Sequence, residues 1–318
     1  MILEILLLVV GFFILIKGAD IFVDGASSIA TKFKVPKILI GLTIVAFGTS
    51  FPELAVSIKS VISNNHDIVL GNVIGSNIMN ILLILGVSSF FHALKVENNT
   101  IKKEIPFMIL ISILFSALIS DSIFDKGVVN AFTRSDGIII LLFFIIFIYY
   151  LISMALKKKD EGGEETKAMP LWKGFLYVLV GLVMIFFGSN FVVDNASSIA
   201  KGMGVSEKMI SLTIIALGTS LPELVTSVTA AKKGECDLAV GNVIGSNIFN
   251  IGVVLGIPIS LFGGINKINF SYLDMSVMLI SASLLFFFSL NDHKISKREG
   301  LIFIVIFIIY YGYVIING

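Results

Sequence analysis

Long runs of apolar residues alternate with short polar segments along the whole chain. The runs lack the two-residue alternation of a membrane barrel strand, and many are close to the ~20 residues that a helix needs to cross a bilayer. Helices are expected because a segment in lipid must bond its own backbone polar groups. The pattern predicts an all-α integral membrane protein with ten transmembrane helices, at residues 2–30, 36–61, 68–91, 105–121, 136–156, 171–200, 206–231, 238–262, 271–290 and 299–316.

Composition supports a membrane protein. Hydrophobic residues make up 56% of the 318 residues and charged residues only 14%, with a mean hydropathy of +1.00. Soluble domains carry about 25% charged residues. A single cysteine, Cys236, excludes an intramolecular disulfide and a cysteine-based metal site. The net charge of +1 comes without a basic patch, so the expected partner is the lipid bilayer and not nucleic acid.

The distribution of Lys and Arg between the loops predicts the orientation in the cell membrane. Odd-numbered loops hold sixteen of these residues and even-numbered loops hold six. Positive residues favour the cytoplasmic side, so both termini are predicted to be extracellular. The segment 157–170 is polar and carries both signs of charge, which predicts a cytoplasmic linker too short to fold as a regulatory domain.

An internal repeat relates the two halves at a constant offset of 170 residues. "GTSFPELAVS" begins at Gly48 and "GTSLPELVTS" at Gly218, while "DGASSIA" (24–30) returns as "DNASSIA" (194–200). "GNVIGSNIMN" (71–80) and "GNVIGSNIFN" (241–250) agree at nine of ten positions. Gene duplication explains the offset, and it predicts two five-helix repeats at 1–156 and 171–318.

Five helices per repeat make the second copy enter the membrane from the opposite side. The halves are therefore predicted to be inverted repeats, related by a pseudo-two-fold axis in the membrane plane. This arrangement is typical of secondary transporters, whose substrate site lies near the midplane where the repeats meet.

The proline in each GTS-x-PEL motif predicts a broken helix. Pro52 and Pro222 have no N–H, and each ring clashes with the carbonyl four residues earlier. A kink is expected around 48–50 and again around 218–220. Carbonyl oxygens released there can bind cations if they line a cavity.

Each motif also places a carboxylate deep in the membrane. Glu53 lies about 17 residues after its predicted helix begins, roughly mid-membrane at ~1.5 Å per residue. Thr49 shares its helical face, as Thr219 does with Glu223. An intramembrane carboxylate is a functional candidate. The alternative is a structural glutamate that is buried in its protonated form or paired with a basic side chain. It is disfavoured because neither helix offers Lys or Arg at that depth.

The second motif adds serine and asparagine side chains at helical spacing. Two interpretations stay open, cation ligands or hydrogen bonds between helices, and they are equally weighted for Asn72, Asn77, Asn242 and Asn247. All candidate groups are oxygen donors, which suit Ca²⁺ and Na⁺ and disfavour Zn²⁺ and Cu. Two carboxylates supply about −2, which one Ca²⁺ neutralises and which two or three Na⁺ balance within about one charge. Competition for one anionic cage is what exchange requires.

Together the paired motifs resemble the α1 and α2 repeats of the sodium/calcium exchangers, in the cation/calcium antiporter superfamily, and the chain is similar to a compact prokaryotic member. The resemblance covers nearly the whole chain. It implies an antiporter that exchanges Na⁺ for Ca²⁺ by alternating access and extrudes Ca²⁺, with three Na⁺ per Ca²⁺ as the usual ratio. It also implies that the long first and sixth helices are the gating pair.

The resemblance assigns a role to each candidate residue. Glu53 and Glu223 are the shared central ligands, and Asn80 and Asn250 lie beside them. Ser76 and Ser246 complete outlying Na⁺ sites. Hydroxyl or carbonyl oxygens come from the remaining positions: Thr49, Ser50, Thr219 and Ser220, with Ala46 and Ala216 contributing carbonyls.

Other functions are weighed against this one. Potassium-dependent exchangers carry Asp at the second asparagine position, so Asn80 and Asn250 disfavour K⁺ dependence. Proton/calcium exchangers have a different motif around the glutamate, and a channel is disfavoured by the inverted repeat. The sequence contains neither a catalytic nucleophile with a base nor a metal-binding triad, so an enzyme is disfavoured. No cofactor is expected, the chain is expected to function as a monomer, and Asp24 and Asp194 remain without a role.

Overall fold

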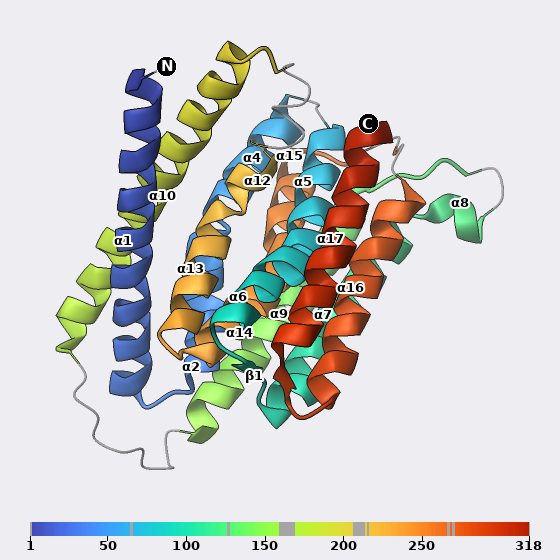
Figure 1. Ribbon diagram of the computed structural model, residues 1–318. Coiled ribbons are helices and arrows are strands. Elements are labelled where there is room, and N and C mark those ends of the chain that lie inside the picture. Colours follow the sequence, from blue (N-terminus) through green and yellow to red (C-terminus); the bar gives the residue numbers. More distant parts are fainter. Residues whose placement is uncertain are drawn as a thin grey trace.

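Nearly all of the described chain is helical, as Figure 1 shows. The structure is a computed structural model, and it describes residues 2–63, 66–125, 128–158, 169–205, 214, 216–265, 268 and 271–317. Most of the predicted linker 157–170 and the beginning of the predicted helix 206–231 lie outside these residues. The all-helical class is confirmed, with two short antiparallel strands as the exception, β1 (Leu94–Lys95) and β2 (Lys294–Ile295).

The helices follow the predicted segments closely. In the first half they are α1 (Ile2–Phe33), α2 (Lys37–Ile40), η1 (Gly41–Val45), α3 (Ala46–Thr49), α4 (Phe51–Ile62), α5 (His66–Met79), η2 (Asn80–Leu85), α6 (Gly86–Phe91), η3 (Thr100–Glu104), α7 (Ile105–Leu118), α8 (Asp121–Phe124) and α9 (Arg134–Lys158). In the second half they are α10 (Leu171–Gly202), α12 (Ala216–Thr219), α13 (Leu221–Lys232), α14 (Cys236–Phe249), η5 (Asn250–Leu255), α15 (Gly256–Phe262), α16 (Tyr272–Leu290) and α17 (Lys297–Asn317). The η elements are π-helices, which the apolar pattern does not predict.

Seven helices within the described residues are long and apolar enough to cross a membrane. A bent pair, Lys37–Thr49 with Phe51–Ile62, adds an eighth candidate with an angle of 47° at the break. The predicted segment 105–121 is not among them, because η3 and α7 form one continuous helix that carries Lys102, Lys103 and Glu104 near its start. Two continuous stretches form the centre of the bundle: 72% of the Ile68–Phe91 window and 83% of the Cys236–Phe262 window are buried, against 17% for Lys297–Ile316.

The two longest helices, α1 and α10, pack against each other through glycines spaced seven residues apart. Gly18 of α1 faces Met184, where an added Cβ would lie 2.7 Å from the Met184 Cβ. Gly181 and Gly188 of α10 face Phe22 and Leu15 in the same way. Contacts that advance along one helix as they recede along the other make the pair antiparallel. Glycine lets the backbones approach closely where lipid provides no hydrophobic driving force.

A second glycine contact fixes the centre of the bundle. Gly241 of α14 lies against Gly41 of η1, where an added Cβ would be 3.0 Å from the Gly41 Cα. Gly245, one turn further, lies against Leu42 and Ala46. The GxxxG spacing of the second motif therefore brings α14 onto the segment that leads into the first helix break.

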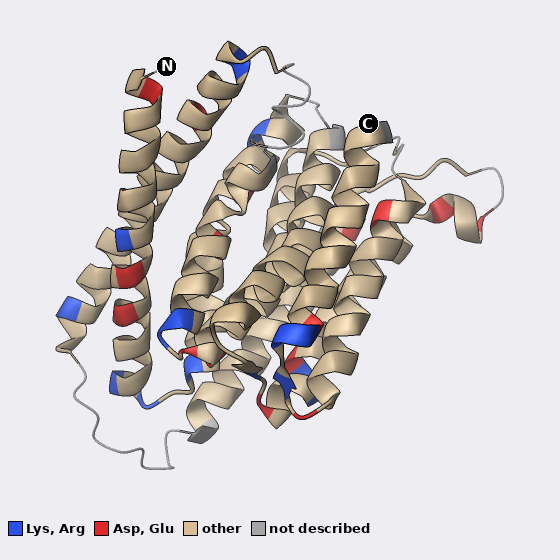
Figure 2. Cartoon of the chain, in the orientation of Figure 1, with Lys and Arg blue, Asp and Glu red and all other residues tan. Residues whose placement is uncertain are grey.

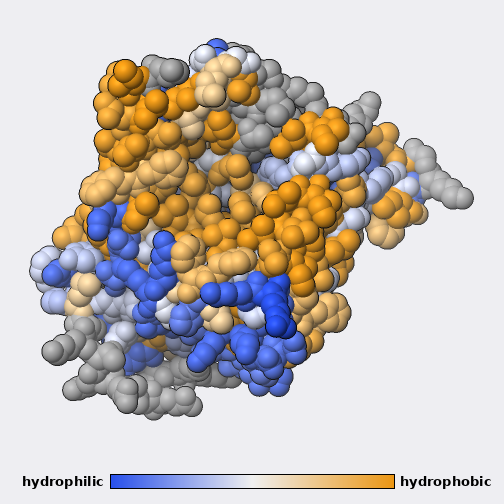
Figure 3. Space-filling model, in the orientation of Figure 1, coloured by the Kyte–Doolittle hydropathy of each residue, from blue (hydrophilic) through white to orange (hydrophobic). Residues whose placement is uncertain are grey.

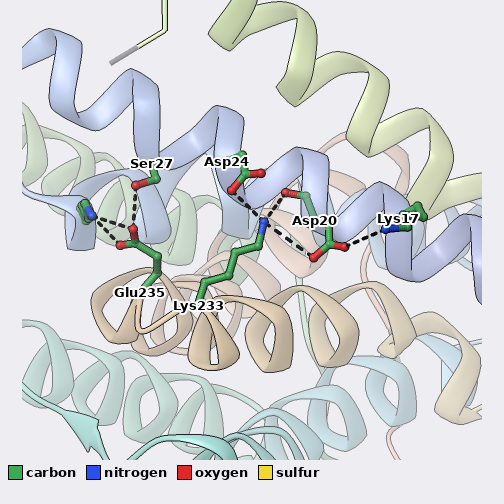
Figure 4. A network of polar contacts seen from close by, with 7 residues as sticks. Lys17, Asp20, Asp24, Ser27, Lys233 and Glu235 are labelled. Carbon is green, nitrogen blue, oxygen red and sulfur yellow. Dashed lines mark hydrogen bonds and ion pairs between the residues drawn. The ribbon is translucent and has the colours of Figure 1, made fainter. Parts of the chain in front are cut away.

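Charged residues are concentrated at one end of the molecule. Lys and Arg gather mostly towards the lower end in Figure 2, and an apolar band covers most of the face above it in Figure 3. At the charged end, Figure 4 shows α1 tied to the turn between α13 and α14. Lys233 Nζ lies 2.7 Å from Asp24 Oδ1 and 3.6 Å from Asp20 Oδ1. Glu235 accepts from Ser27 Oγ at 2.9 Å and pairs with Lys37 Nζ at 2.6 Å.

Candidate cation site

Both predicted helix breaks are present, and each leaves a glutamate in the first turn of a new helix. Ser50 (φ −86°, ψ 8°) separates α3 from α4, and Ser220 (φ −87°, ψ 4°) separates α12 from α13. Glu53 and Glu223 follow three residues later, and both are fully buried. A helix N-terminus favours a negative charge, so the breaks position the carboxylates as well as bend the chain.

The two serines at the breaks do not cap their own helices. The spacing Ser-x-x-Glu is the pattern of a capping box, in which the serine hydroxyl bonds the helix backbone. Neither serine makes such a bond. Ser50 Oγ instead donates to Glu223 Oε1 at 2.9 Å, and Ser220 Oγ donates to Ser76 Oγ at 3.2 Å. The serine at each break therefore bonds a residue of the opposite half and not the backbone of its own helix. This departure from the capping pattern marks the site.

Several buried oxygens at the site have no hydrogen-bond partner among the described residues. They are both carboxylate oxygens of Glu53, Oε2 of Glu223, Oδ1 of Asn80, Oδ1 of Asn250 and Oγ of Ser246. The ion pairs between described residues all involve other carboxylates. A buried carboxylate without compensation costs several kcal/mol. The donor set therefore fits a cation as its missing partner.

The chemistry of these donors restricts the ion. The described residues contain no group of three or more His, Cys, Asp or Glu side chains that could hold a metal. Two carboxylates with neutral amide and hydroxyl oxygens are hard ligands, which suit Ca²⁺ and Na⁺. Such ions would be substrates of this site and not resident cofactors.

The remaining predicted residues lie in the turns that lead into the breaks. Thr49 Oγ1 is within 3.1 Å of both the Val45 carbonyl and Asn242 Oδ1. The Ala46 carbonyl accepts from the Ser50 N–H at 3.0 Å. On the other side, α12 begins at Ala216 and ends at Thr219, directly before Ser220.

Asn72 and Asn242 hold the backbone behind each glutamate. Asn242 Nδ2 donates to the Glu223 carbonyl at 3.5 Å and to Ser227 Oγ at 2.9 Å. Asn72 Nδ2 makes the equivalent contacts with the Glu53 carbonyl at 3.3 Å and Ser57 Oγ at 3.4 Å. These contacts favour the structural interpretation for both asparagines. Ser57 and Ser227 could have been identified from the sequence, because each is the last residue of one copy of the ten-residue repeat motif.

Asn77 and Asn247 cross-link the two central helices. Asn80 Nδ2 donates to Asn247 Oδ1 at 2.9 Å, and Asn250 Nδ2 donates to Asn77 Oδ1 at 3.1 Å. Asn77 Nδ2 and Asn247 Nδ2 each donate to the backbone carbonyl of the other residue, at 3.4 and 3.2 Å. The π-helices η2 and η5 begin at Asn80 and Asn250, a placement common at functional sites.

One carbonyl released by proline has a partner that the sequence does not predict. Pro222 leaves the Gly218 carbonyl without its helical donor, and Ser189 Oγ of α10 donates to this oxygen at 3.2 Å. A carbonyl released in this way is expected from the sequence to be able to bind a cation, but here the Ser189 hydroxyl is its partner. At the matching position of the first half, 170 residues earlier, Ala19 has no hydroxyl. The two breaks are therefore not chemically identical.

Comparison with known proteins gives a consistent result. The model of the family described as sodium/calcium exchanger protein matches residues 3–153 and 173–316. The chain is 33% identical to the sodium/calcium exchanger MaX1 of Methanosarcina acetivorans, over 95% of this chain and 96% of the relative. It is 36% identical to the inner membrane protein YrbG of Escherichia coli, over 88% and 86%.

A solved structure shares the fold. The sodium-calcium exchanger NCX_Mj, soaked with Na⁺ and Sr²⁺, superposes with a TM-score of 0.82 at 34% identity, covering 97% of both chains. An all-helical membrane bundle around buried, oxygen-only groups from two halves is the architecture of a secondary cation transporter, not of an enzyme. The chain belongs to the sodium/calcium exchanger family.

Proposed function

We propose that this chain is an antiporter that exchanges Na⁺ for Ca²⁺, with Glu53 and Glu223 as ligands shared by both ions. The observation that carries the proposal is the pair of buried carboxylates from opposite halves, with oxygens that lack any partner among the described residues. The ligand set would be completed by Thr49, Ser50, Thr219, Ser220, Ser76, Ser246, Asn80 and Asn250, and by the Ala46 and Ala216 carbonyls.

Charge balance explains why such a site would exchange and not leak. One Ca²⁺ neutralises the two carboxylates, and several Na⁺ do so nearly. A loaded site is then close to neutral and can pass between apolar walls, whereas an empty site keeps a charge of about −2 that is costly to move in low dielectric. Alternating access would therefore need a bound ion for movement in each direction. We propose Ca²⁺ extrusion as the physiological direction.

The proposed architecture is ten spans in two inverted five-helix repeats, 1–156 and 171–318, joined by the linker 157–170. Three observations support it. The elements α4 and α13, and α5 and α14, have bounds that differ by 170 residues. The pair α1 and α10 is antiparallel. Basic residues gather at one end in Figure 2, which supports a cytoplasmic linker and extracellular termini. Because one chain supplies both carboxylates, we expect a functional monomer.

The test is Ca²⁺ flux in liposomes with the Na⁺, K⁺ and H⁺ gradients varied one at a time. A Na⁺ gradient alone should drive Ca²⁺ in the opposite direction, with no requirement for K⁺. Ca²⁺ movement that follows only the pH gradient would establish proton coupling instead. Single-channel currents would establish a channel.

A further inference from the structure

The amides of Asn80 and Asn250 can each face the site with either end. Their oxygen and nitrogen ends are almost equal in size, so packing alone does not select the oxygen. Both oxygens are buried and have no hydrogen-bond partner among the described residues, and both nitrogens donate to a neighbour. The neighbour belongs to the opposite half in each case: Asn247 for Asn80, and Asn77 for Asn250.

These neighbours have orientations of their own that the backbone determines. Asn77 uses Nδ2 to bond the Asn247 carbonyl, so its Oδ1 is turned towards Asn250. Asn247 uses Nδ2 to bond the Asn77 carbonyl, so its Oδ1 is turned towards Asn80. A main-chain carbonyl has no donor end and cannot reverse its role. The orientation of all four amides therefore rests on two backbone oxygens at the crossing of α5 and α14.

We propose that Asn77 and Asn247 are positioning residues that turn the oxygens of Asn250 and Asn80 towards the transported ion. This role rests on the proposed cation site, in which Asn80 and Asn250 are ligands. A reversed Asn250 amide would place its oxygen against Asn77 Oδ1 and direct two N–H groups at a cation. Both contacts are repulsive, so the Asn77 oxygen selects the productive orientation.

The same geometry distinguishes amide from carboxylate at the ligand positions. An Asp at position 250 would set a carboxylate oxygen against Asn77 Oδ1, where Asn250 now donates a hydrogen bond at 3.1 Å. Asn77 therefore favours a neutral ligand across from it and keeps the charge of the site at that of the two glutamates. The symmetric argument applies to Asn247 and position 80.

Each ligand amide also lies at the start of a π-helix that packs against the helix carrying the opposite carboxylate. The π-helix η5, which begins at Asn250, packs against α4 with Glu53, and η2, which begins at Asn80, packs against α13 with Glu223. Each half thus contributes one carboxylate, one ligand amide and one residue that orients the ligand amide of the other half. The cross-linked amides make a correctly oriented site depend on contact between α5 and α14.

A double-mutant cycle separates positioning from general stability. Asn77→Ala is introduced into the parent chain, into Asn250→Asp and into Asn80→Asp, and the KM and kcat for Ca²⁺ are measured by Na⁺-driven uptake in liposomes. In the parent chain we expect Asn77→Ala to raise KM about tenfold, the effect of one lost hydrogen bond. In Asn250→Asp the increase should vanish or reverse, because two equivalent carboxylate oxygens need no orientation and the repulsion from Asn77 is gone.

The crossed combination is the matched control. Asn80 donates to Asn247 and not to Asn77, so Asn77→Ala should raise KM by the same factor in Asn80→Asp as in the parent. The mirror cycle, Asn247→Ala with Asn80→Asp and with Asn250→Asp as its crossed control, tests the second pair and replaces the first if Asn77→Ala does not fold. Equal effects of the alanine substitution in all three backgrounds, in both cycles, would overturn the positioning role.

The failure of the underlying site gives a different result. If Asn80→Ala and Asn250→Ala both leave KM unchanged while the parent chain exchanges Na⁺ for Ca²⁺, the two asparagines are not ligands. The positioning role then falls together with their assignment. If both raise KM but the cycles are additive, the ligands stand and only the positioning role is wrong.

Discussion

Ser50 in one half donates a hydrogen bond to Glu223 in the other, with 2.9 Å between Ser50 Oγ and Glu223 Oε1. The two residues are 173 positions apart, and each lies at a proline-induced helix break of its own repeat. A break that serves only to bend a helix would use the serine to cap its own backbone. The contact shows that the two breaks are parts of one polar centre.

The charge of this centre predicts the effect of removing either carboxylate. Glu53→Gln and Glu223→Gln each remove half of the negative charge while keeping the shape of the side chain. We expect a loss of Ca²⁺ exchange of about a hundredfold or more, since breaking a buried charge interaction costs about 3–5 kcal/mol. Flux in liposomes measures this. The control is Glu235→Gln, which changes a glutamate that pairs with Lys37 outside the site and should leave transport near the parent value.

The neutral ligands should contribute less than the carboxylates. Asn80→Ala and Asn250→Ala each remove one amide oxygen without changing the charge of the site. We expect the KM for Ca²⁺ to rise about tenfold in each, consistent with about 1–1.5 kcal/mol for a hydrogen-bonding group. A full loss of exchange, equal to that of the glutamate variants, would contradict the ranking of ligands by charge.

Ser189 predicts a stability effect specific to the second break. Ser189→Ala leaves the Gly218 carbonyl without the donor that replaces the missing N–H of Pro222. An unsatisfied buried acceptor costs about 1–3 kcal/mol, and the loss should appear in thermal unfolding in detergent. Ser283→Ala is the control, because that hydroxyl bonds the Leu279 carbonyl of its own helix. Equal destabilisation by both changes would show that the Gly218 carbonyl does not depend on Ser189.

The contacts of Lys233 predict a modest, salt-sensitive link between α1 and the bundle. Lys233→Ala removes the ion pairs with Asp20 and Asp24, whose side chains are 37% and 48% exposed. Because these pairs are partly solvated, we expect a loss of only about 0.2–1 kcal/mol in the free energy of unfolding. The loss should shrink as ionic strength rises. A difference between Lys233→Ala and parent that is independent of salt would argue against an electrostatic link.

The helices, the two helix breaks and the pairing of the two glutamates could be predicted from the sequence, because short-range patterns and the internal repeat determine them. Apolar runs located the helices, proline located both breaks, and the 170-residue offset paired Glu53 with Glu223. Contacts between the halves were not predictable in the same way. The cross-linked amides of Asn77 and Asn247, and the donation from Ser189 to Gly218, depend on how distant helices meet. The partner of Asp24 was also missed, because Lys233 lies in a different half and no spacing relates the two.

Ser50 and Ser220 show how a contact between the halves can be hidden in the sequence behind a common local pattern. Ser-x-x-Glu before an apolar helix ordinarily indicates a cap, and both copies here satisfy that pattern. Only the structure reveals that neither hydroxyl is used locally. A local rule that fails twice at equivalent positions points to the site, since departures from local consistency concentrate at functional positions.

Equilibrium competition between Na⁺ and Ca²⁺ on the purified protein tests most directly whether the two ions share Glu53 and Glu223. Radioactive Ca²⁺ binding is measured in detergent at increasing Na⁺, for the parent chain and for both glutamine variants. The shared site predicts that Na⁺ displaces Ca²⁺ completely and with more than first-order dependence on Na⁺, and that both variants lose Ca²⁺ binding. Ca²⁺ binding that persists at saturating Na⁺, or that survives in either variant, would contradict it.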